Sequence, residues 1–433
     1  MLLIYTPTIT SRHRYIFNLF FSEIYDIKFH ITEDDYEFIT YDGPKLNYSD
    51  NIFNNEIFIE SIGLLNETGI NHYNIDVSLD NGVPLFFKTA SETTISFDIF
   101  SASFFLVSRY EEYFIKDKDE HKRFKPEDSI AFKNNFLEKP VINIWAAILV
   151  DNISERFPNL DIIHPTYNYL SSIDVDNVFC YMGKGIVRSV LGFIASIFRL
   201  DLNSVNKRIR VLLGIDTDPY DTFDIQLKIQ ERFKLKVIYF FLLGDYRKND
   251  KNISYKNKEF RKIIVDISNY AKIGLHPSYS SNYKTRKRYL EKERIENILN
   301  DVVTSSRQHY LKLKLPETYN RLVDLGIKDD YTMGYASAIG FRASICSSFK
   351  FYNLLSEDVL PIRIHPFAVM DSTLLYYLKL TPKDSLSKIS ELIKQVKDVN
   401  GTFISLWHNE SFSDYKKWKG WGRLYEEMVD LAN

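Results

Sequence analysis

Two carboxylates one residue apart mark the end of an apolar and β-branched stretch near the middle of the chain. Asp174 ends the predicted strand 167–174, and Asp176 follows it. Residues i and i+2 of a strand share one face, and ligands of open and barrel α/β folds gather where strands end. Either carboxylate can hold a metal ion while the other stays free, or both are solvated turn acids. We take the first alternative and predict a metal-dependent hydrolase.

Polar side chains stand at comparable places after two later strands. His276 ends the apolar strand 273–276, where one ring nitrogen can reach a metal ion; a lone histidine at such a place is more often structural. Arg307 and His309 lie two residues apart on one strand face, where they can pair with an active-site Asp and touch metal or substrate. The alternative is an exposed edge strand.

The last polar cluster lies near the end of the chain. His408 follows the apolar strand 402–407 and has Trp407 beside it, and Arg342 ends the predicted strand 339–342. Four of the nine histidines therefore lie in or just after predicted strands of one half of the chain, namely His276, His309, His365 and His408. This recurrence favours a shared site over coincidence.

Strands and helices alternate from about residue 166 onward, which is typical of parallel βαβ units. The predicted strands are 167–174, 237–243, 273–276, 308–312, 339–342, 362–364 and 402–407. The predicted helices are 222–233, 258–271, 284–303, 316–325 and 385–399. Six or seven such units predict an α/β fold of the (β/α) barrel type, distorted or incomplete, with its chemistry at the carboxyl ends of the strands.

A smaller α/β domain precedes this barrel. Its predicted helices are 11–24, 97–114 and 140–156, and Pro158 ends the last of them. The domains predicted are thus 1–160 and 166–433.

A pair of helices is inserted at about 181–213, and we expect it to pack over the barrel. Its apolar run 190–198 lies near Lys207, Arg208 and Arg210, a composition that also suits an anionic membrane surface.

The order of these motifs over residues 166–433 resembles the polysaccharide deacetylase family, which has the NodB-homology fold and forms carbohydrate esterase family four. That family opens with a strand end that carries a catalytic base and a metal-binding Asp, and Ser172-Ile173-Asp174-Val175-Asp176-Asn177 is similar to it. The resemblance implies that Asp174 is the base and Asp176 a metal ligand. The family's two acids are adjacent, whereas here one residue separates them.

The family's second motif places two histidines four residues apart. His276 matches the first histidine, whereas Ser280 occupies the place of the second. His309, Ser280 or Asn282 can fill the gap, and we favour His309 because imidazole is the better zinc ligand.

Further positions match the remaining motifs. By the resemblance Arg307 orients the base, with Arg342 as a rival for that role and as a substrate contact, and His408 in Leu406-Trp407-His408 is the general acid. Tyr310 and Trp407 would contact substrate, although core packing is equally open for an aromatic side chain. The first part of the chain resembles the uncharacterised domain that precedes such deacetylases in some bacterial proteins.

Composition excludes several other classes of protein. The 55 Lys and Arg balance 57 Asp and Glu, so nucleic-acid binding is not expected. Two distant cysteines, Cys180 and Cys346, exclude a disulfide scaffold and favour a reducing compartment. No basic segment precedes the first apolar run and no apolar run approaches the roughly 20 residues of a membrane span. We therefore expect a cytoplasmic bacterial protein without a transmembrane segment.

These inferences define the expected reaction. A divalent metal ion, zinc, would serve the removal of an N-acetyl group from a sugar or glycan precursor, with an ester as an alternative substrate. The other class of function is a catalytically weak or inactive protein of the deacetylase fold that binds carbohydrate or assists glycan assembly. Ser280, at the place of the missing histidine, is the main support for that alternative.

Overall fold

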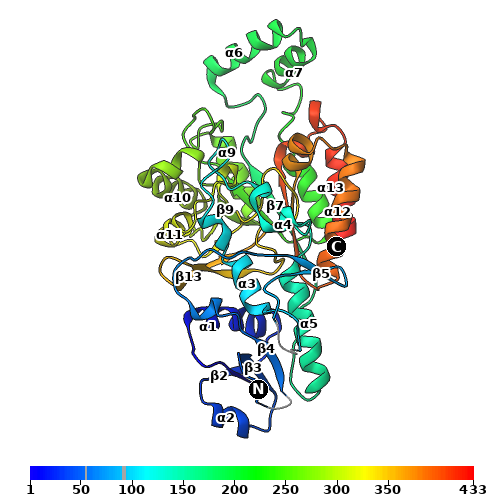
Figure 1. Ribbon diagram of the computed structural model, residues 1–433. Helices are drawn as coiled ribbons and strands as arrows, with labels where there is room; N and C mark the ends of the chain where they lie inside the picture. Colours follow the sequence, from blue (N-terminus) through cyan, green and yellow to red (C-terminus); the bar gives the residue numbers. More distant parts are fainter. Residues whose placement is uncertain (54–55, 90–93) are drawn as a thin grey trace.

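The strands of the chain form two large sheets, one in each half of the sequence (Figure 1). The computed structural model describes residues 1–53, 56–89 and 94–433. Both halves contribute to one continuous cluster of buried apolar side chains. The two halves therefore share a hydrophobic core.

The smaller sheet is parallel, with the order β2-β1-β3-β4 among the described residues. Its strands are β1 (Leu2–Tyr5), β2 (Phe29–Thr32), β3 (Lys45–Ser49) and β4 (Ile57–Glu60). The helices of this half are α1 (Ser11–Phe17), α2 (Asp35–Thr40), α3 (Ile99–Val107), α4 (Ile130–Lys133) and α5 (Val141–Arg156). α1 continues as a π-helical segment, Asn18–Ile24, so the predicted helix 11–24 changes its winding partway. The first half also contains a short antiparallel pair of strands, β5 (Ser78–Asp80) and β6 (Val83–Leu85).

Helix α3 connects the two halves. It begins after Asp98, whose carboxylate accepts a hydrogen bond from the backbone N–H of Ser101. All of its residues are buried, because Phe100 packs on Phe17 of α1 while Phe104 packs on Tyr352 in the second half. A helix that is apolar all round is suited to this position between two layers.

The larger sheet has the order β12-β13-β11-β10-β9-β8-β7-β15-β14 among the described residues. Its strands are β7 (Asn168–Val175), β8 (Val237–Phe241), β9 (Lys272–Leu275), β10 (Ser305–Ser306), β11 (Asp329–Asp330), β12 (Phe349–Asn353), β13 (Asp358–Ile364), β14 (Val369–Met370) and β15 (Thr402–His408). All pairs are parallel except β12 with β13. Within the described part of the chain no pairing joins β12 to β14, so this sheet is open.

The helices of the second half lie close to their predicted ranges. The five predicted helices are α8 (Phe223–Phe233), α9 (Lys258–Ser268), α10 (Thr285–Leu299), α11 (Glu317–Asp324) and α12 (Pro382–Lys397). A further helix, α13 (Trp421–Ala432), was not predicted. The alternation of strands and helices that the sequence indicated is therefore confirmed.

Two predicted strands are wrong. Residues 308–312 form a tight turn in which Tyr310 has a φ of 62°, while the strand of this unit is the shorter β10. Residues 339–342 lie in a loop. Their apolar side chains are buried because the loop packs on the first half, where the N–H of Phe341 donates to the backbone oxygen of Leu137 at 2.8 Å. Burial without sheet pairing produced the same apolar pattern as a strand.

The insert forms a helical hairpin of α6 (Gly185–Phe198) and α7 (Leu202–Leu212). Figure 1 shows it at the top of the molecule, standing away from the sheet. The expectation that it packs over the barrel is wrong, because no residue of α6 is buried. None of the helices in the described residues combines the length and the apolar character that a membrane span requires.

Ion pairs join the two halves at their contact. Arg12 donates to Glu357 at 2.6 Å and 3.0 Å, and Arg342 forms a forked pair with Glu112 at 2.7 Å and 2.9 Å. The Arg12, Glu112 and Arg342 side chains are almost fully buried. Buried charges require such partners, so the contact fixes how the halves are placed.

Candidate active site and metal centre

Four neighbouring parallel strands carry the candidate residues at their carboxyl ends. Asp174 lies on β7, His276 follows β9, Arg307 follows β10 and His408 ends β15. These strands and β8 are consecutive in the sheet order β10-β9-β8-β7-β15. Their carboxyl ends meet at one edge, which is where ligands of parallel α/β sheets bind.

Asp176, His276 and His309 form a cluster that could hold a metal ion. One ligand atom of each lies within 4.8 Å of the others. The Nε2 atom of His276 is 3.2 Å from Asp176 Oδ1, and the Nε2 atom of His309 is 3.4 Å from Asp176 Oδ2. Two imidazoles and one carboxylate are a common ligand set of catalytic zinc.

Further groups fix the orientation of both imidazole rings. The Nδ1 atom of His276 is 2.6 Å from the backbone oxygen of Arg307, and the Nδ1 atom of His309 is 3.1 Å from Asp250 Oδ1. Metal-binding histidines usually use their second nitrogen in this way. Both Nε2 atoms are therefore left to face Asp176.

The environment of the Asp176 carboxylate also suits a bound cation. The Oδ1 atom of this carboxylate is buried and makes no hydrogen bond within the described part of the chain, a costly arrangement unless a positive charge meets it. Burial raises the pKa of Asp176, but the cationic His309 ring and the His276 ring outweigh it and hold that pKa well below its usual range. Burial likewise lowers the pKa of His309, but Asp176 and Asp250 raise it to about 9. A divalent cation would take the place of the His309 proton as the positive charge that Asp176 faces, so the residues present fit such an ion.

Asp174 is held separately, by Arg307. The guanidinium donates from Nη1 to Asp174 Oδ1 at 2.9 Å, from Nη2 to Ser172 Oγ at 2.8 Å and from Nε to the Tyr331 backbone oxygen at 2.9 Å. Arg307 is fully buried and lies over the Phe240 ring. Each of the three guanidinium nitrogens donates one hydrogen bond, so Asp174 has one defined orientation.

His408 faces the same cluster with its Nε2 atom, 3.9 Å from Asp176 Oδ2. Asp371, directly after β14, binds it from behind: Oδ1 is 2.7 Å from His408 Nδ1, and Oδ2 accepts from the His408 backbone N–H at 2.8 Å. Burial lowers the pKa of His408, but the Asp371 carboxylate outweighs it and raises the pKa to about 10. This imidazole is therefore held as a cation at neutral pH.

A cavity of about 340 Å³ opens onto these groups. Its lining includes Asp174, Asp176, His276, His309 and His408, together with Tyr310, Arg123, Met370, Tyr376, Tyr377 and Glu410. Burial raises the pKa of Glu410 to about 7. The size of this cavity suits a small molecule or one residue of a longer polymer.

One wall of the cavity comes from the first half of the chain. The Nη1 atom of Arg123 donates to the backbone oxygen of Tyr310 at 2.9 Å, and its Nε atom donates to Asp119 at 2.6 Å. The Arg123 residue is only 8% exposed. The first half therefore contributes a cation to the lining.

The structure brings most of the predicted site residues together and places the others elsewhere. Arg342 lies outside the cavity and pairs with Glu112. Trp407 is fully buried and packs on Tyr425, so its ring does not face the cavity. Ser280 is also outside the cavity, where its hydroxyl lies 3.1 Å from that of Ser278.

Sequence reasoning did not find some supporting residues. Asp250 lies in a charged loop, and nothing in the neighbouring sequence distinguishes it from a solvated acid. Asp371 follows an apolar dipeptide, Val369–Met370, and the sequence indicates a polar position there but not its contact with His408. Arg123 lies in another charged loop, and its distance in sequence from the second half concealed its role in the lining.

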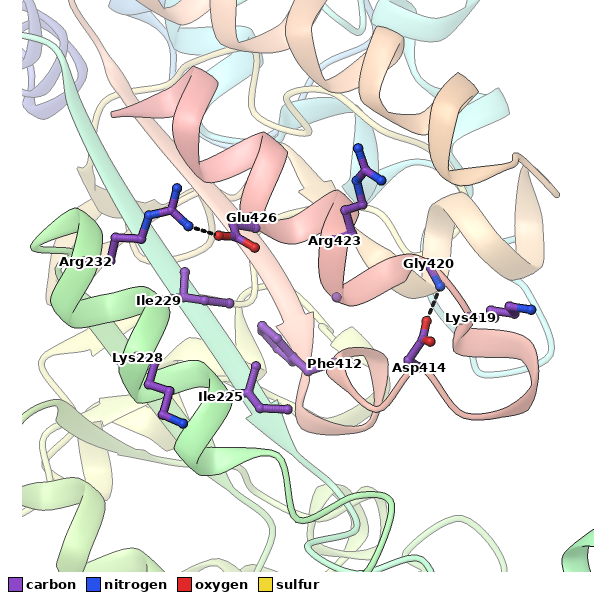
Figure 2. A pocket seen from close by; sticks show the side chains of 11 residues that line it. Ile225, Lys228, Ile229, Arg232, Phe412, Asp414, Lys419, Gly420, Arg423 and Glu426 are labelled. Atoms are coloured by element: carbon purple, nitrogen blue, oxygen red, sulfur yellow. Dashed lines mark hydrogen bonds and ion pairs between the residues drawn. The ribbon is translucent and has the colours of Figure 1, made fainter.

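A second hollow lies at the surface, between α8 and α13 (Figure 2). It measures about 760 Å³ and contains none of the predicted site residues. Figure 2 shows an ion pair between Arg232 and Glu426 at its margin, with Ile225, Ile229 and Phe412 beneath.

Comparison with known proteins adds the following findings. A family described as a family of unknown function, DUF7033, matches residues 2–158. No curated protein matches the chain. Among solved structures, a candidate polysaccharide deacetylase from Mycobacterium smegmatis is 12% identical over 61% of this chain and 83% of its own, with a TM-score of 0.39.

Two structures from the genus Bacillus are similar at the same level. The polysaccharide deacetylase of Bacillus cereus is 11% identical over 62% of this chain and 88% of its own, with a TM-score of 0.28. A pseudoenzyme of the CE4 family from Bacillus anthracis is 14% identical over 61% of this chain and 62% of its own, with a TM-score of 0.29. At TM-scores below 0.5 these likenesses do not bear on what this chain does.

Proposed function

We propose that this protein is a metal-dependent hydrolase that removes N-acetyl or O-acetyl groups from a sugar or glycan precursor. One observation carries the proposal: Asp176, His276 and His309 meet beside an arginine-held acid, Asp174, and an acid-held imidazole, His408. Metal-assisted acyl hydrolysis requires these parts in one place. The resemblance of the sequence motifs to the polysaccharide deacetylases supports the acetyl group as the one removed.

Asp176, His276 and His309 would hold the metal ion, which we propose to be zinc. A bound divalent cation would supply a Lewis acid that activates water and polarises an acyl carbonyl. The backbone oxygen of Arg307 and the Asp250 carboxylate keep both Nε2 atoms directed at the site. Tyr310 lines the same cavity and would contact the acyl group.

Asp174 is the proposed general base. Arg307 holds its Oδ1 atom at 2.9 Å, and its Oδ2 atom lies 3.8 Å from His276 Nε2. Oδ2 therefore faces the cluster and can accept the proton of attacking water. Because Asp174 is nearly buried, the carboxylate keeps this position without competition from bulk solvent.

His408 is the proposed general acid. Asp371 fixes the ring through Nδ1 and favours its protonated form, so the Nε2–H can be given to the departing amine. His408 enters the cavity from β15 and Asp174 from β7, and the two residues are paired in register on these strands. A substrate between them would have its base and its acid on adjacent strands.

We also propose that residues 1–160 and 166–433 are two domains, that the open sheet of the second corresponds to an incomplete (β/α) barrel, and that the protein acts in the bacterial cytoplasm. Arg123 gives the first domain a proposed role, because it lines the cavity. A precursor made inside the cell suits such a location.

The test measures metal content and acetate release on the same preparations of the full chain. After chelation and reconstitution with Zn, Co, Ni or Mn, we expect about one equivalent of metal and acetate release from N-acetylated or O-acetylated oligosaccharides. Asp174→Asn and His408→Gln should each lower turnover by about two to four powers of ten. The matched control is His365→Gln, since His365 pairs with Asp329 at 2.8 Å outside the cavity.

Two outcomes would contradict the proposal. Metal content below about a tenth of an equivalent would exclude a metal-dependent reaction. Stoichiometric metal without acetate release from any acetylated sugar would favour the other class of function, a carbohydrate-binding protein of the deacetylase fold. Comparing N-acetyl with O-acetyl substrates separates the amide from the ester reaction.

A further inference from the structure

Helix α6 presents its apolar face to solvent. An ordinary surface helix buries its apolar stripe and exposes its polar one. In α6 the exposed side chains recur with helical spacing along one stripe, with exposed fractions from 41% to 83%. They are Ile186, Val187, Val190, Leu191, Ile194, Ile197 and Phe198. The described residues of the chain do not cover this stripe.

The opposite side of α6 is small and polar, and it faces α7. The guanidinium of Arg208 donates to the backbone oxygen of Ser189 at 3.3 Å. A Cβ atom on Gly192 would lie only 2.8 Å from that guanidinium. The inward face of α6 therefore accommodates the cationic side chain of Arg208. Because this face packs on α7, the apolar stripe points to solvent.

The apolar surface continues beyond α6. Leu200 is 84% exposed in the connection between the helices, Leu202 is 71% exposed, and Leu213 is 69% exposed after α7. Exposed apolar side chains gathered on one hairpin of a folded protein indicate a binding partner.

Polar contacts attach the hairpin to the body. Arg188 donates to the backbone oxygens of Asn252 and Lys251 at 3.2 Å and 2.8 Å, and Lys416 pairs with Asp201 at 2.9 Å. These contacts hold the hairpin in its projecting position (Figure 1) without using the apolar stripe.

The charge of the hairpin identifies the partner. Residues 181–216 contain six Lys and Arg against two Asp, whereas the whole chain carries a net charge of −2. Basic residues beside an exposed apolar helical stripe are attracted to anionic lipid headgroups while the stripe enters the acyl boundary. We propose that the α6–α7 hairpin docks this protein on the surface of a membrane that contains anionic lipids.

The docked helix lies in the plane of the membrane. Its 14 residues are fewer than the roughly 20 that cross a bilayer, and its polar side is occupied by α7. The hairpin follows β7 in the chain, and its anchors at Asn252 and Lys416 come after β8 and β15. Docking would therefore bring the carboxyl edge of the large sheet, with its cavity, towards the lipid surface.

The test is vesicle sedimentation of the full chain at low salt. We expect binding to vesicles in which about a third of the phosphatidylcholine is replaced by phosphatidylglycerol, and weaker binding as salt rises. The double variant Val190→Ser/Leu191→Ser should bind about tenfold more weakly. The matched control, Leu79→Ser/Leu355→Ser, removes leucines that are 69% and 67% exposed elsewhere and should bind as the unaltered chain does.

A fluorescent side chain on α6 would report contact between the apolar stripe and the vesicle. The four native tryptophans are at most 1% exposed, so they give a constant background. Phe198→Trp places an indole on the stripe, and its emission should shift to shorter wavelength with anionic vesicles and not with phosphatidylcholine alone.

Three results would overturn the inference. They are absence of binding by the folded chain, equal binding by the Val190→Ser/Leu191→Ser variant, and a dimer that the same variant converts to monomer without any vesicle binding. The last result would assign the stripe to a second copy of the chain. These measurements use no acetylated sugar, so their failure leaves the proposed hydrolase untouched.

Discussion

Asp371 binds His408 twice, through Oδ1 to the ring Nδ1 at 2.7 Å and through Oδ2 to the backbone N–H at 2.8 Å. The carboxylate is fully buried, and the ring it holds reaches the cavity from β15. This pair determines both the direction and the protonation of the proposed general acid.

Asp371→Asn should reduce kcat about 100-fold, because the uncharged amide no longer favours the imidazolium. A general acid works in its protonated form, below its pKa. The carboxylate raises the pKa of His408, so its loss should move the alkaline fall in activity to lower pH. Profiles of kcat against pH for both proteins would decide this, and an unchanged alkaline limb would contradict the assignment of His408.

Arg307 is expected to support both the fold and the base. Arg307→Met should lower the free energy of unfolding by about 3 to 5 kcal/mol, because it leaves the Asp174 carboxylate buried without a partner. Arg307→Lys keeps the charge but loses the fork that binds Asp174 and Ser172 together. We expect this second variant to fold and to lose most of its turnover. Urea unfolding and acetate release measure the two effects, and normal turnover of Arg307→Lys would refute the role.

Metal should stabilise the protein through His309 and its support, Asp250. At a free metal concentration about 100 times Kd, the free energy of unfolding should rise by about 2.7 kcal/mol. Asp250→Asn should weaken metal binding by about 10- to 100-fold, because the ring of His309 loses the negative charge of its orienting acceptor. Ser280→Ala is the control and should bind metal normally, since its hydroxyl faces Ser278. Equal weakening by both substitutions would place the third ligand elsewhere.

His13 should make the fold sensitive to acid. Burial lowers the pKa of His13 from 6.5 to about 4, and its Nε2 atom has no hydrogen-bond partner among the described residues. A lowered pKa in the folded state stabilises the neutral form. The neutral His13 ring therefore contributes to the free energy of unfolding, and this contribution is complete above about pH 6.5. It is lost as the pH falls through about 4, by up to about 3 kcal/mol.

The variant His13→Gln would isolate this contribution. A glutamine three residues after the N-cap Thr10 preserves the capping box in which His13 now takes part. Its free energy of unfolding should fall less steeply than that of the unaltered chain between pH 6.5 and pH 4. Parallel curves from urea unfolding would count against the prediction.

Local patterns in the sequence indicate that the candidate residues converge. Asp174, His276 and His408 each end an apolar run short enough for a strand, and alternation with helices makes the strands parallel. Parallel strands bring their carboxyl ends to one edge, so the sequence contained the information for this cluster. Their chemical roles remain proposals that the variants above test.

Other features depend on contacts between distant segments, and no local pattern reports them. The roles of Asp250 and Asp371 depend on the histidine rings that they orient. These rings lie 59 and 37 residues away in sequence. The strand predicted at 339–342 failed because Phe341 is buried by the first half instead of by a neighbouring strand. The expectation that the insert packs over the barrel was wrong because periodicity reveals the apolar face of α6 but not what covers it.

The reach of Arg123 across the molecule has a consequence for how this protein can diversify. The side chains that would break a bond all belong to the second half, while Arg123 of the first half closes a wall of the same cavity. A fragment that begins at residue 166 would keep the proposed reactive side chains in its sequence but would lose Arg123 and the first half's share of the common core. The proposed reactive side chains and Arg123 thus lie in separate stretches of the chain. Changes around residue 123 can alter which molecule enters while the atoms that react stay as they are.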